Sequence, residues 1–430
     1  MFETIRNAFK TADIRKKLLY TLLIIIIFRI GCAIPVPFLD PSQLASTINA
    51  QGSFLGYLNV LTGGGLEHAT LFAMSITPYI NASIIIQLLT VAIPALERLQ
   101  KEGEEGRKVL NKITRYLTVA LGAIQAIGYY FLLKRSGAVE FTKGFEGIYA
   151  AIIIVVTFTA GTALIVWLGE RITEKGIGNG ISIILFAGII SRGPAAFQTL
   201  KGLWDLGGQG AWQNYIYVPL IIVIFIAMIV FIIVMTNAER RIPVQYAKRV
   251  VGRKMYGGQS SHIPVKVSMS GVMPIIFATS ILSIPSMIAG FVNVQSGFWF
   301  HFFKVFNYDS WGYAILYFVL IIAFNFFYIA IQYNPVEIAN NLRKNNGAIP
   351  GIRPGKPTSD FISKVIWKIA MVGAMFLGVI AVFPIIFQIF TGAAISLGGT
   401  SIIIIVGVAL ETMRTLESQL MMRHHKGFLE

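Results

Sequence analysis

Ten long apolar segments alternate with polar connections along the chain. They cover residues 18–36, 70–93, 116–133, 149–169, 177–191, 215–235, 268–290, 311–333, 365–388 and 396–413. Most of them reach the ~20 residues that an α-helix needs to cross a hydrocarbon core about 30 Å thick. The pattern predicts an all-α polytopic membrane protein with ten transmembrane helices.

Positive charge is distributed unevenly over the connections between these segments. When the connections are assigned alternately to the two sides of a membrane, one side holds 29 lysine and arginine residues and the other holds six, while Arg29 lies inside the first segment. Basic residues accumulate on the cytoplasmic side of membrane proteins. We therefore predict that both termini lie in the cytoplasm.

The connection 193–213 divides the segments into two halves, residues 1–192 and residues 214–430. Each half has five segments, and because five is an odd number, the second half enters the membrane from the side opposite to the first. This topology permits an inverted repeat with a pathway between the halves. We find no repeat at the level of individual residues, so the prediction rests on topology alone.

Composition narrows the class of protein further. A hydrophobic fraction of 55% and a mean hydropathy of +0.69 exclude a soluble enzyme, and most of the net charge of +16 follows from the topology. The single cysteine, Cys32, permits no intramolecular disulfide. The first segment runs to the turn at Pro35-Val36-Pro37 without a small-residue cleavage site, so we expect a retained helix, not a signal peptide.

Two connections on the predicted cytoplasmic side, residues 237–266 and 334–364, are too long to be simple turns. The first is strongly basic. The second contains Gly351-Ile352-Arg353-Pro354-Gly355-Lys356-Pro357, whose proline and glycine content predicts a shaped loop with few helical options. Both connections are candidate docking surfaces.

A short apolar stretch, residues 52–61, precedes the second segment and is followed by the glycines 63–65. A helix of about three turns cannot span a bilayer, and three glycines give it a flexible attachment. From the residues alone, this half-helix either rests on the membrane surface or folds into a cavity between helices.

Two aliphatic pairs lie at helical spacing. Pro78 is expected to interrupt the helix of the second segment, where Ile76 and Ile80 are one turn apart, and Ile181 and Leu185 have the same spacing in the fifth segment. An isoleucine stripe on a membrane helix usually contacts lipid or a neighbouring helix. Spacing alone therefore does not assign these residues a function.

Five longer stretches resemble the SecY family of protein-conducting channels. They are Phe-Arg-Ile-Gly at 28–31, Thr-Pro-Tyr-Ile-Asn-Ala-Ser-Ile-Ile-Ile-Gln-Leu-Leu at 77–89, Gly-Ile-Gly-Asn-Gly-Ile-Ser at 176–182, Arg-Arg-Ile-Pro-Val-Gln-Tyr-Ala-Lys-Arg at 240–249 and Gly-Ile-Arg-Pro-Gly at 351–355. They occur in the order of the family, and the resemblance extends over essentially the whole chain. It implies two inverted halves that close around an hourglass pore.

The resemblance also implies roles for individual residues. It identifies residues 52–65 as a plug, which favours the cavity for the half-helix, and its apolar residues are Phe54, Leu55, Tyr57, Leu58, Val60 and Leu61. The family's aliphatic pore ring matches Ile76, Ile80, Ile181, Leu185, Ile276 and Ile404. A seam between the second and third helices and the seventh and eighth is expected to admit signal peptides. The implied function is translocation of secretory polypeptides across the bacterial cytoplasmic membrane and insertion of membrane proteins into it.

The chain carries no nucleotide-binding motif, its membrane segments lack paired acidic or histidine ligands, and His424-His425 lies in a solvated tail, so we expect a passive pore without cofactor, metal or catalytic residue. The resemblance implies that the SecA ATPase or a ribosome drives transport, and that the small subunits SecE and SecG and membrane lipids are partners. Motor and ribosome contacts are expected at Arg240, Arg241, Lys248, Arg249, Arg253, Lys254, Arg353 and Lys356. Clustered basic residues suit polyanionic ribosomal RNA.

The alternative class is a secondary transporter, which can share inverted repeats and glycine-broken helices. Transporters place ionisable groups at mid-membrane to couple ions. Here Glu170, Glu239 and Glu411 fall at segment ends, which favours the channel. Arg29 is expected to snorkel toward the outer funnel and to have a structural role.

Overall fold

The computed structural model describes residues 2–40, 59, 64–135, 137–141, 144–208, 214–246, 249–251, 254–256, 260–291, 297–306, 310–391 and 399–426. Helices account for most of them. The helices are α1 (Phe2–Lys10), α2 (Ala12–Gly31), α5 (Thr77–Ala92), α6 (Pro94–Lys101), α7 (Glu104–Arg135), α8 (Gly144–Lys175), α9 (Gly180–Ile190), α10 (Gly193–Gly207), α11 (Asn214–Asn237), α12 (Met273–Phe291), α13 (Phe298–Val305), α14 (Trp311–Gln332), α15 (Pro335–Lys344), α16 (Lys356–Thr391) and α17 (Gly399–Lys426).

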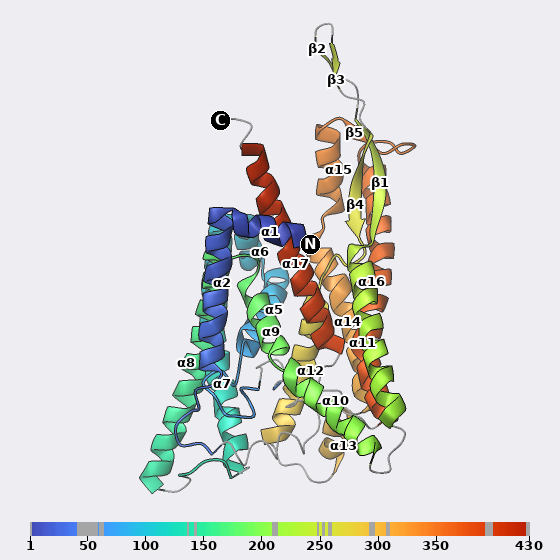
Figure 1. Ribbon diagram of the computed structural model, residues 1–430. Helices are drawn as coiled ribbons and strands as arrows, with labels where there is room; N and C mark the ends of the chain where they lie inside the picture. The colour runs from blue at the N-terminus through green and yellow to red at the C-terminus, as the bar shows by residue number, and fades with distance from the viewer. Residues whose placement is uncertain are drawn as a thin grey trace.

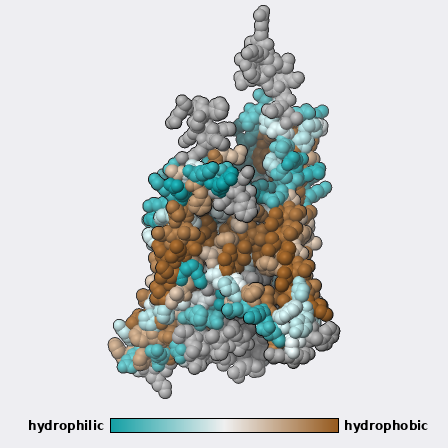
Figure 2. All heavy atoms as spheres, in the orientation of Figure 1, coloured by the Kyte–Doolittle hydropathy of each residue, from teal (hydrophilic) through white to brown (hydrophobic). Residues whose placement is uncertain are grey.

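Each of the ten predicted segments contains one helix, and these are α2, α5, α7, α8, α9, α11, α12, α14, α16 and α17. Among the described residues, six spans are long and apolar enough to cross a membrane, and a seventh is added if α5 and α6, bent by 102° at Ile93, count as one. Figure 2 shows an apolar belt across the middle of one face of the molecule, with hydrophilic residues above and below it. The fold is a helical membrane-protein fold, as the sequence predicted.

The second segment differs from its prediction in one respect. Pro78 does not interrupt a helix, because α5 begins at Thr77 and the proline occupies its first turn. Proline is favoured there because it lacks an N–H group, and the N–H groups of the first helical residues have no acceptor within the helix. Residues 71–76 form turns. Ala69, two residues before them, and Ser75, within them, have positive φ angles of 45° and 49°.

Part of the long basic connection, residues 237–266, forms β-strands. β1 (Glu239–Tyr246) lies between β4 (Ser260–Lys266) and β5 (Gly347–Ala348) in an antiparallel sheet, and β2 (Arg249–Val251) pairs with β3 (Lys254–Tyr256). Figure 1 shows these strands at one end of the molecule, which we call the sheet end, with β1 and β4 beside α15 and with β2 and β3 extending beyond the helices. The sequence analysis did not anticipate them.

The second long connection is more helical than predicted. α15 fills Pro335–Lys344, and the Asn334 side chain caps it by accepting hydrogen bonds from the N–H groups of Val336 and Glu337. The expectation of few helical options is therefore wrong for this part. Between α15 and α16 the chain does form a shaped loop, in which Gly351 and Gly355 have φ angles of 80° and 107° that favour glycine.

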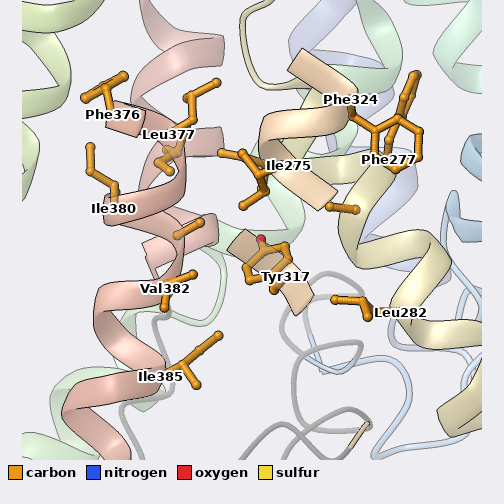
Figure 3. Packing of buried hydrophobic residues seen from close by; sticks show 14 of the residues in the cluster. Ile275, Phe277, Leu282, Tyr317, Phe324, Phe376, Leu377, Ile380, Val382 and Ile385 are labelled. Atoms are coloured by element: carbon orange, nitrogen blue, oxygen red, sulfur yellow. The ribbon is translucent and has the colours of Figure 1, made fainter. Parts of the chain in front are cut away.

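The largest buried cluster lies in the second half of the chain. Figure 3 shows its packing, with Ile275, Phe277 and Leu282 of α12, Tyr317 and Phe324 of α14, and Phe376, Leu377, Ile380, Val382 and Ile385 of α16. Ile84 of α5 belongs to the same cluster, so α5 packs against the second half. Burial of this apolar surface against neighbouring helices holds the half together.

Candidate pore and docking surfaces

A second buried cluster, which we call the ring cluster, brings together most of the predicted ring residues. Ile76, Leu185 and Ile404 belong to it and are at most 4% exposed, while Ile80 and Ile181 are partly buried and pack against it. They come from the start of α5, from α9 and from α17. Residues from both halves of the chain therefore meet in one aliphatic cluster.

Local sequence explains how α9 presents two of these side chains. Asn179 caps the helix, and its Oδ1 accepts hydrogen bonds from the N–H groups of Ile181 at 3.1 Å and Ser182 at 3.4 Å. Gly180 lies so close to α8 that an added Cβ would be 1.9 Å from the carbonyl oxygen of Gly169. The cap and the close approach fix the first turn of α9, which carries Ile181, and Leu185 follows one turn later.

The sixth predicted ring residue, Ile276, is partly buried and is not a member of the ring cluster. Val272, one turn earlier, packs against this cluster, and the Ile276 N–H donates to the Val272 carbonyl at 3.3 Å. A Cβ added at Gly407 of α17 would lie 2.8 Å from Val272 Cγ2. Sequence reasoning missed Val272. Its position four residues before Ile276, one helical turn away, could have indicated that it lies near the ring.

The predicted seam for signal peptides corresponds to α5 and α7 on one side and α12 and α14 on the other. Several buried hydroxyls on α5 and α12 bind their own helix: Thr90 donates to the Ile86 carbonyl, Thr279 to that of Ile275 and Ser283 to that of Ser280. These three groups keep their partners if the two helices separate. Apolar contacts, such as those of Ile84 in the larger cluster, join the helices.

A cavity of ≈ 620 Å³ with a mixed polar and apolar lining lies beside the end of α9, and Arg29, His68, Ser191 and Arg192 are among the residues that line it. Arg29 is in the last turn of α2, and its Nη1 donates to Ser191 Oγ at 2.9 Å. Arg192 forms an ion pair with Glu67. Both arginines thus reach polar surroundings from apolar helices, as snorkelling side chains do.

Four of the predicted docking residues are exposed at or near the sheet end: Arg240 and Arg241 on β1, Arg353 in the glycine loop and Lys356 at the start of α16. Arg241 Nε donates to Glu239 Oε1 at 2.8 Å. Arg249 lies in β2 and Lys254 in β3. The other two predicted docking residues, Lys248 and Arg253, lie outside the described residues, as do all six predicted plug residues.

The base of the basic connection is attached to α17. Arg414 Nη2 donates to Asn237 Oδ1 at 2.7 Å and to the Thr236 carbonyl at 3.2 Å, so a cation binds the C-terminal end of α11. Burial and the neighbouring Arg414 lower the pKa of Lys266, whereas Glu239 opposes this shift. Among the described residues, no group of His, Cys, Asp and Glu is arranged to hold a metal.

Comparison with known proteins decides between channel and transporter. A family model described as SecY matches residues 70–413. The chain is 45% identical over 444 residues to the protein translocase subunit SecY of Streptomyces scabiei, and 100% of each chain is covered. The chain belongs to the SecY family. It is a protein translocase subunit that forms a protein-conducting channel through a membrane, as the sequence predicted, and the secondary-transporter alternative is not favoured.

Solved structures agree with this family fold. A structure of SecY in which the plug domain stabilises the closed state of the translocation channel has a TM-score of 0.64 and 18% identity, and the match covers 94% of this chain and 92% of that chain. Sec61 in the canine ribosome-channel complex from the endoplasmic reticulum has a TM-score of 0.58 and 16% identity, with the same coverage. At these identities the likeness shows the fold.

Proposed function

We propose that polypeptide passes between the two halves of this protein, residues 1–192 and 214–430, through a constriction formed by the ring residues Ile76, Ile80, Ile181, Leu185, Ile276 and Ile404. One observation carries this proposal. Five of the six ring residues either belong to the ring cluster or pack against it, although they come from three separate helical regions. Residues 52–65 are the proposed plug.

The chemistry of this constriction suits a chain of varied sequence. Alkyl side chains offer an ion nothing to replace its hydration shell, so such a ring closes by dewetting. An extended polypeptide can slide past flexible aliphatic groups that make no specific hydrogen bonds, whereas an ion without partners pays a large desolvation cost. Signal peptides are selected at the seam between α5 and α12, where an apolar helix gains contact with lipid.

Transport is driven from outside the chain, which supplies no catalytic chemistry of its own. A SecA-type ATPase or a ribosome docks on the sheet end through Arg240, Arg241, Lys248, Arg249, Arg253, Lys254, Arg353 and Lys356. Lys356 supports a docking role, because it is exposed at the N-terminal end of α16, where the helix dipole disfavours a cation and the first turn holds no acidic residue. Binding of polyanionic RNA there weakens with salt.

The sheet end faces the cytoplasm in this proposal. α1 and the end of α17 lie toward this end of the molecule (Figure 1), and this arrangement supports a cytoplasmic location for both termini, on the side of the basic connections. The membrane is the bacterial cytoplasmic membrane, and the exposed apolar belt binds lipid and the small subunits SecE and SecG. Unfolded secretory polypeptides and signal peptides are the transported partners.

Site-specific crosslinking tests the path. Cys32 is replaced by alanine, Ile80→Cys is introduced, and a secretory precursor with one cysteine is stalled midway in membranes supplied with a motor. A disulfide to position 80 that requires the precursor's signal sequence supports passage through the ring. The matched control is Ile124→Cys on α7, which is 59% exposed and should not crosslink.

The result that would reject the path is equally defined. No disulfide at position 80, while the same precursor still joins a cysteine placed in residues 240–266, would mean that the precursor docks without passing the ring.

A further inference from the structure

Three buried hydroxyls beside the ring have no hydrogen-bond partner within the described part of the chain. They are Ser75 Oγ, Thr400 Oγ1 and Ser401 Oγ, and their residues are 2%, 4% and 1% exposed. We call them the outer hydroxyls. Ser75 belongs to the first half of the chain, and the other two belong to the second half. Folded proteins satisfy nearly all of their buried polar groups, so these three need an explanation.

The positions of the outer hydroxyls in the sequence place them next to ring residues. Ser75 directly precedes Ile76, and Thr400 and Ser401 lie four and three residues before Ile404 on α17. Residues three and four apart are neighbours on the surface of an α-helix, so both lie beside Ile404. Ile76 and Ile404 belong to the ring cluster. Hydroxyls from the two halves therefore flank one constriction.

The outer hydroxyls lie on the side of the ring away from the sheet end. α17 begins at Gly399 and runs toward the sheet end, so its first turn is the part farthest from that end (Figure 1). α5 begins at Thr77 and leads to α6, which lies toward the sheet end. Because the sheet end faces the cytoplasm in the proposed orientation, a transported chain meets the ring first and the outer hydroxyls next.

The closed ring carries a cost at these positions. The ring is closed in this structure, since Ile76 and Ile404 are 0% and 2% exposed. A buried hydroxyl without a partner has lost its hydrogen bonds to water and gained none. Ser75 has in addition a left-handed φ of 49°, a kind of strain that is concentrated at ligand sites. A ligand that enters between the halves and binds the hydroxyls would offset their cost.

The main chain of an extended polypeptide has the chemistry that these groups bind. A peptide unit that passes an aliphatic ring has lost its water and finds no hydrogen bond there, which is costly. A hydroxyl can donate to a carbonyl oxygen and can also accept from an N–H group. Carbonyl oxygens occur at every residue of a polypeptide, so such binding does not depend on its sequence.

We propose that the outer hydroxyls of Ser75, Thr400 and Ser401 form a main-chain binding site for the transported polypeptide as it leaves the ring. This proposal rests on the ring function proposed above. Separation of the halves exposes one hydroxyl on one side of the path and two on the other, and the polypeptide supplies the partners that they lack in the closed ring. The site thereby lowers the barrier that dehydration of the main chain sets to passage.

Crosslinking tests where the polypeptide runs. Thr400→Cys and Ile404→Cys are introduced singly into a Cys32→Ala parent, and stalled precursors carry one cysteine at successive positions. Four helical residues rise about 6 Å and an extended chain rises about 3.3 Å per residue. The precursor cysteine that joins position 400 best should therefore be about two residues nearer to the signal sequence than the one that joins position 404. Ile403→Cys is the control, because Ile403 is 3% exposed within the larger buried cluster and should not crosslink.

The second measurement is the rate of a single round of translocation. Thr400→Val keeps the shape of the side chain and removes its hydroxyl, so translocation should slow about fivefold, the worth of one hydrogen bond between neutral groups. The same variant removes an unsatisfied buried group and should melt no lower than the parent. A role in folding alone would not give a slower channel of equal or greater stability. Thr400→Ser keeps the hydroxyl and should translocate at the parent rate.

Thr118→Val is the matched control, since the Thr118 hydroxyl is also buried, on α7, but donates to the Thr114 carbonyl at 2.7 Å. It should leave the rate unchanged, whereas Ser401→Ala should slow translocation as Thr400→Val does. Parent rates in both Thr400→Val and Ser401→Ala, at matched amounts in the membrane, would overturn the proposal. If Thr400→Val does not accumulate, Ser401→Ala decides alone.

The crosslinks separate this proposal from the ring function. Crosslinks at position 404 without any at position 400 would mean that the polypeptide passes the ring and leaves away from the outer hydroxyls, which rejects the binding site alone. Crosslinks at neither position, while the same precursor still joins a cysteine in residues 240–266, would count against the ring function and against the binding site that depends on it.

Discussion

Gly161 of α8 packs directly against the carbonyl oxygen of Leu71, and a Cβ added to this glycine would lie 2.0 Å from that oxygen. No real Cβ comes so close to a backbone atom, so a larger residue must push the two chains apart. Leu71 belongs to the turns that lead to Ile76. The contact therefore determines how near the start of α5 lies to α8.

Gly161→Ala should consequently destabilise the protein by about 3 kcal/mol, the upper range for overpacking a well-packed interior. The measurement is thermal unfolding of the purified protein in detergent. Gly122→Ala on α7 is the control, because there the nearest atom to an added Cβ is Thr162 Cγ2 at 3.8 Å, an ordinary contact. Equal melting temperatures for the two variants would contradict the packing seen at Gly161.

Ser75 combines two unfavourable features immediately before the ring. Its φ of 49° is in the left-handed region, and its buried hydroxyl has no hydrogen-bond partner. The left-handed conformation costs a non-glycine residue about 1–2 kcal/mol. Ser75→Gly removes both features and should raise the melting temperature, after allowance for the greater freedom of glycine in the unfolded chain.

Ser75→Ala separates the two causes, since it removes the hydroxyl and keeps the backbone strain. We expect it to melt between the parent and Ser75→Gly. A Ser75→Gly protein less stable than Ser75→Ala would show that the left-handed conformation contributes no strain at this position.

The sequence predicted the helices better than the connections, for a physical reason. A bilayer forces every spanning segment to satisfy its backbone hydrogen bonds internally, so apolar length alone identifies helices such as α11 and α14. Outside the bilayer this constraint ends. β1 forms because Ile242 and Val244 alternate inward onto a core that includes Ile349 and Ile362, residues more than a hundred positions away. No local pattern reveals those partners.

The candidate site was predictable to a similar extent. The resemblance to a family supplied Ile76, Ile181 and Ile404, which composition and spacing did not distinguish from lipid-facing isoleucines. The ion pair between Glu67 and Arg192 was not predictable, because the two residues lie 125 positions apart and each is an ordinary loop charge in the sequence. Only the folded arrangement brings them together.

Ile404 tests the seal of the proposed ring. Ile404→Asn places an amide in a constriction that closes by excluding water, so hydrated ions should enter more easily. We expect resting conductance in planar bilayers to rise at least about tenfold, since a polar lining removes part of the desolvation cost. Ile404→Leu keeps an alkyl side chain of equal volume and should seal like the parent. Similar conductance for the two variants would place Ile404 outside the constriction.

Asn325 anchors the start of α12 to two other helices. Its Oδ1 accepts a hydrogen bond from Ser270, its Nδ2 donates to the Ala370 carbonyl of α16 at 2.9 Å, and it is 1% exposed. Asn325→Leu leaves the buried Ser270 hydroxyl unsatisfied and should lower the free energy of unfolding by about 2–3 kcal/mol. Denaturation in detergent with the single variants and the double variant Ser270→Ala, Asn325→Leu completes the thermodynamic cycle.

The double variant should recover part of the loss, because an apolar pair has no unsatisfied group. Strict additivity of the two single effects would mean that Ser270 and Asn325 do not depend on each other.

Arg353 tests the proposed docking surface. The residue is exposed in a loop whose shape comes from Gly351 and Gly355, and the Thr358 hydroxyl fixes the loop by donating to the Arg353 carbonyl at 2.8 Å. Because that bond uses the backbone, Arg353→Glu should leave the loop folded and reverse only its charge. Motor-driven translocation into vesicles should fall about tenfold, since the introduced carboxylate would repel the anionic surface that the proposed basic docking site binds.

The matched control is Lys112→Glu, an exposed charge reversal on α7, outside the two long connections. It changes the net charge of the protein by the same amount, so a general electrostatic effect would appear in both variants. Binding of the motor to membranes, measured over a range of salt concentrations, should lose affinity and salt dependence in Arg353→Glu only. Equal translocation by Arg353→Glu and the parent, at matched amounts in the membrane, would mean that the arginine serves the loop and not the motor.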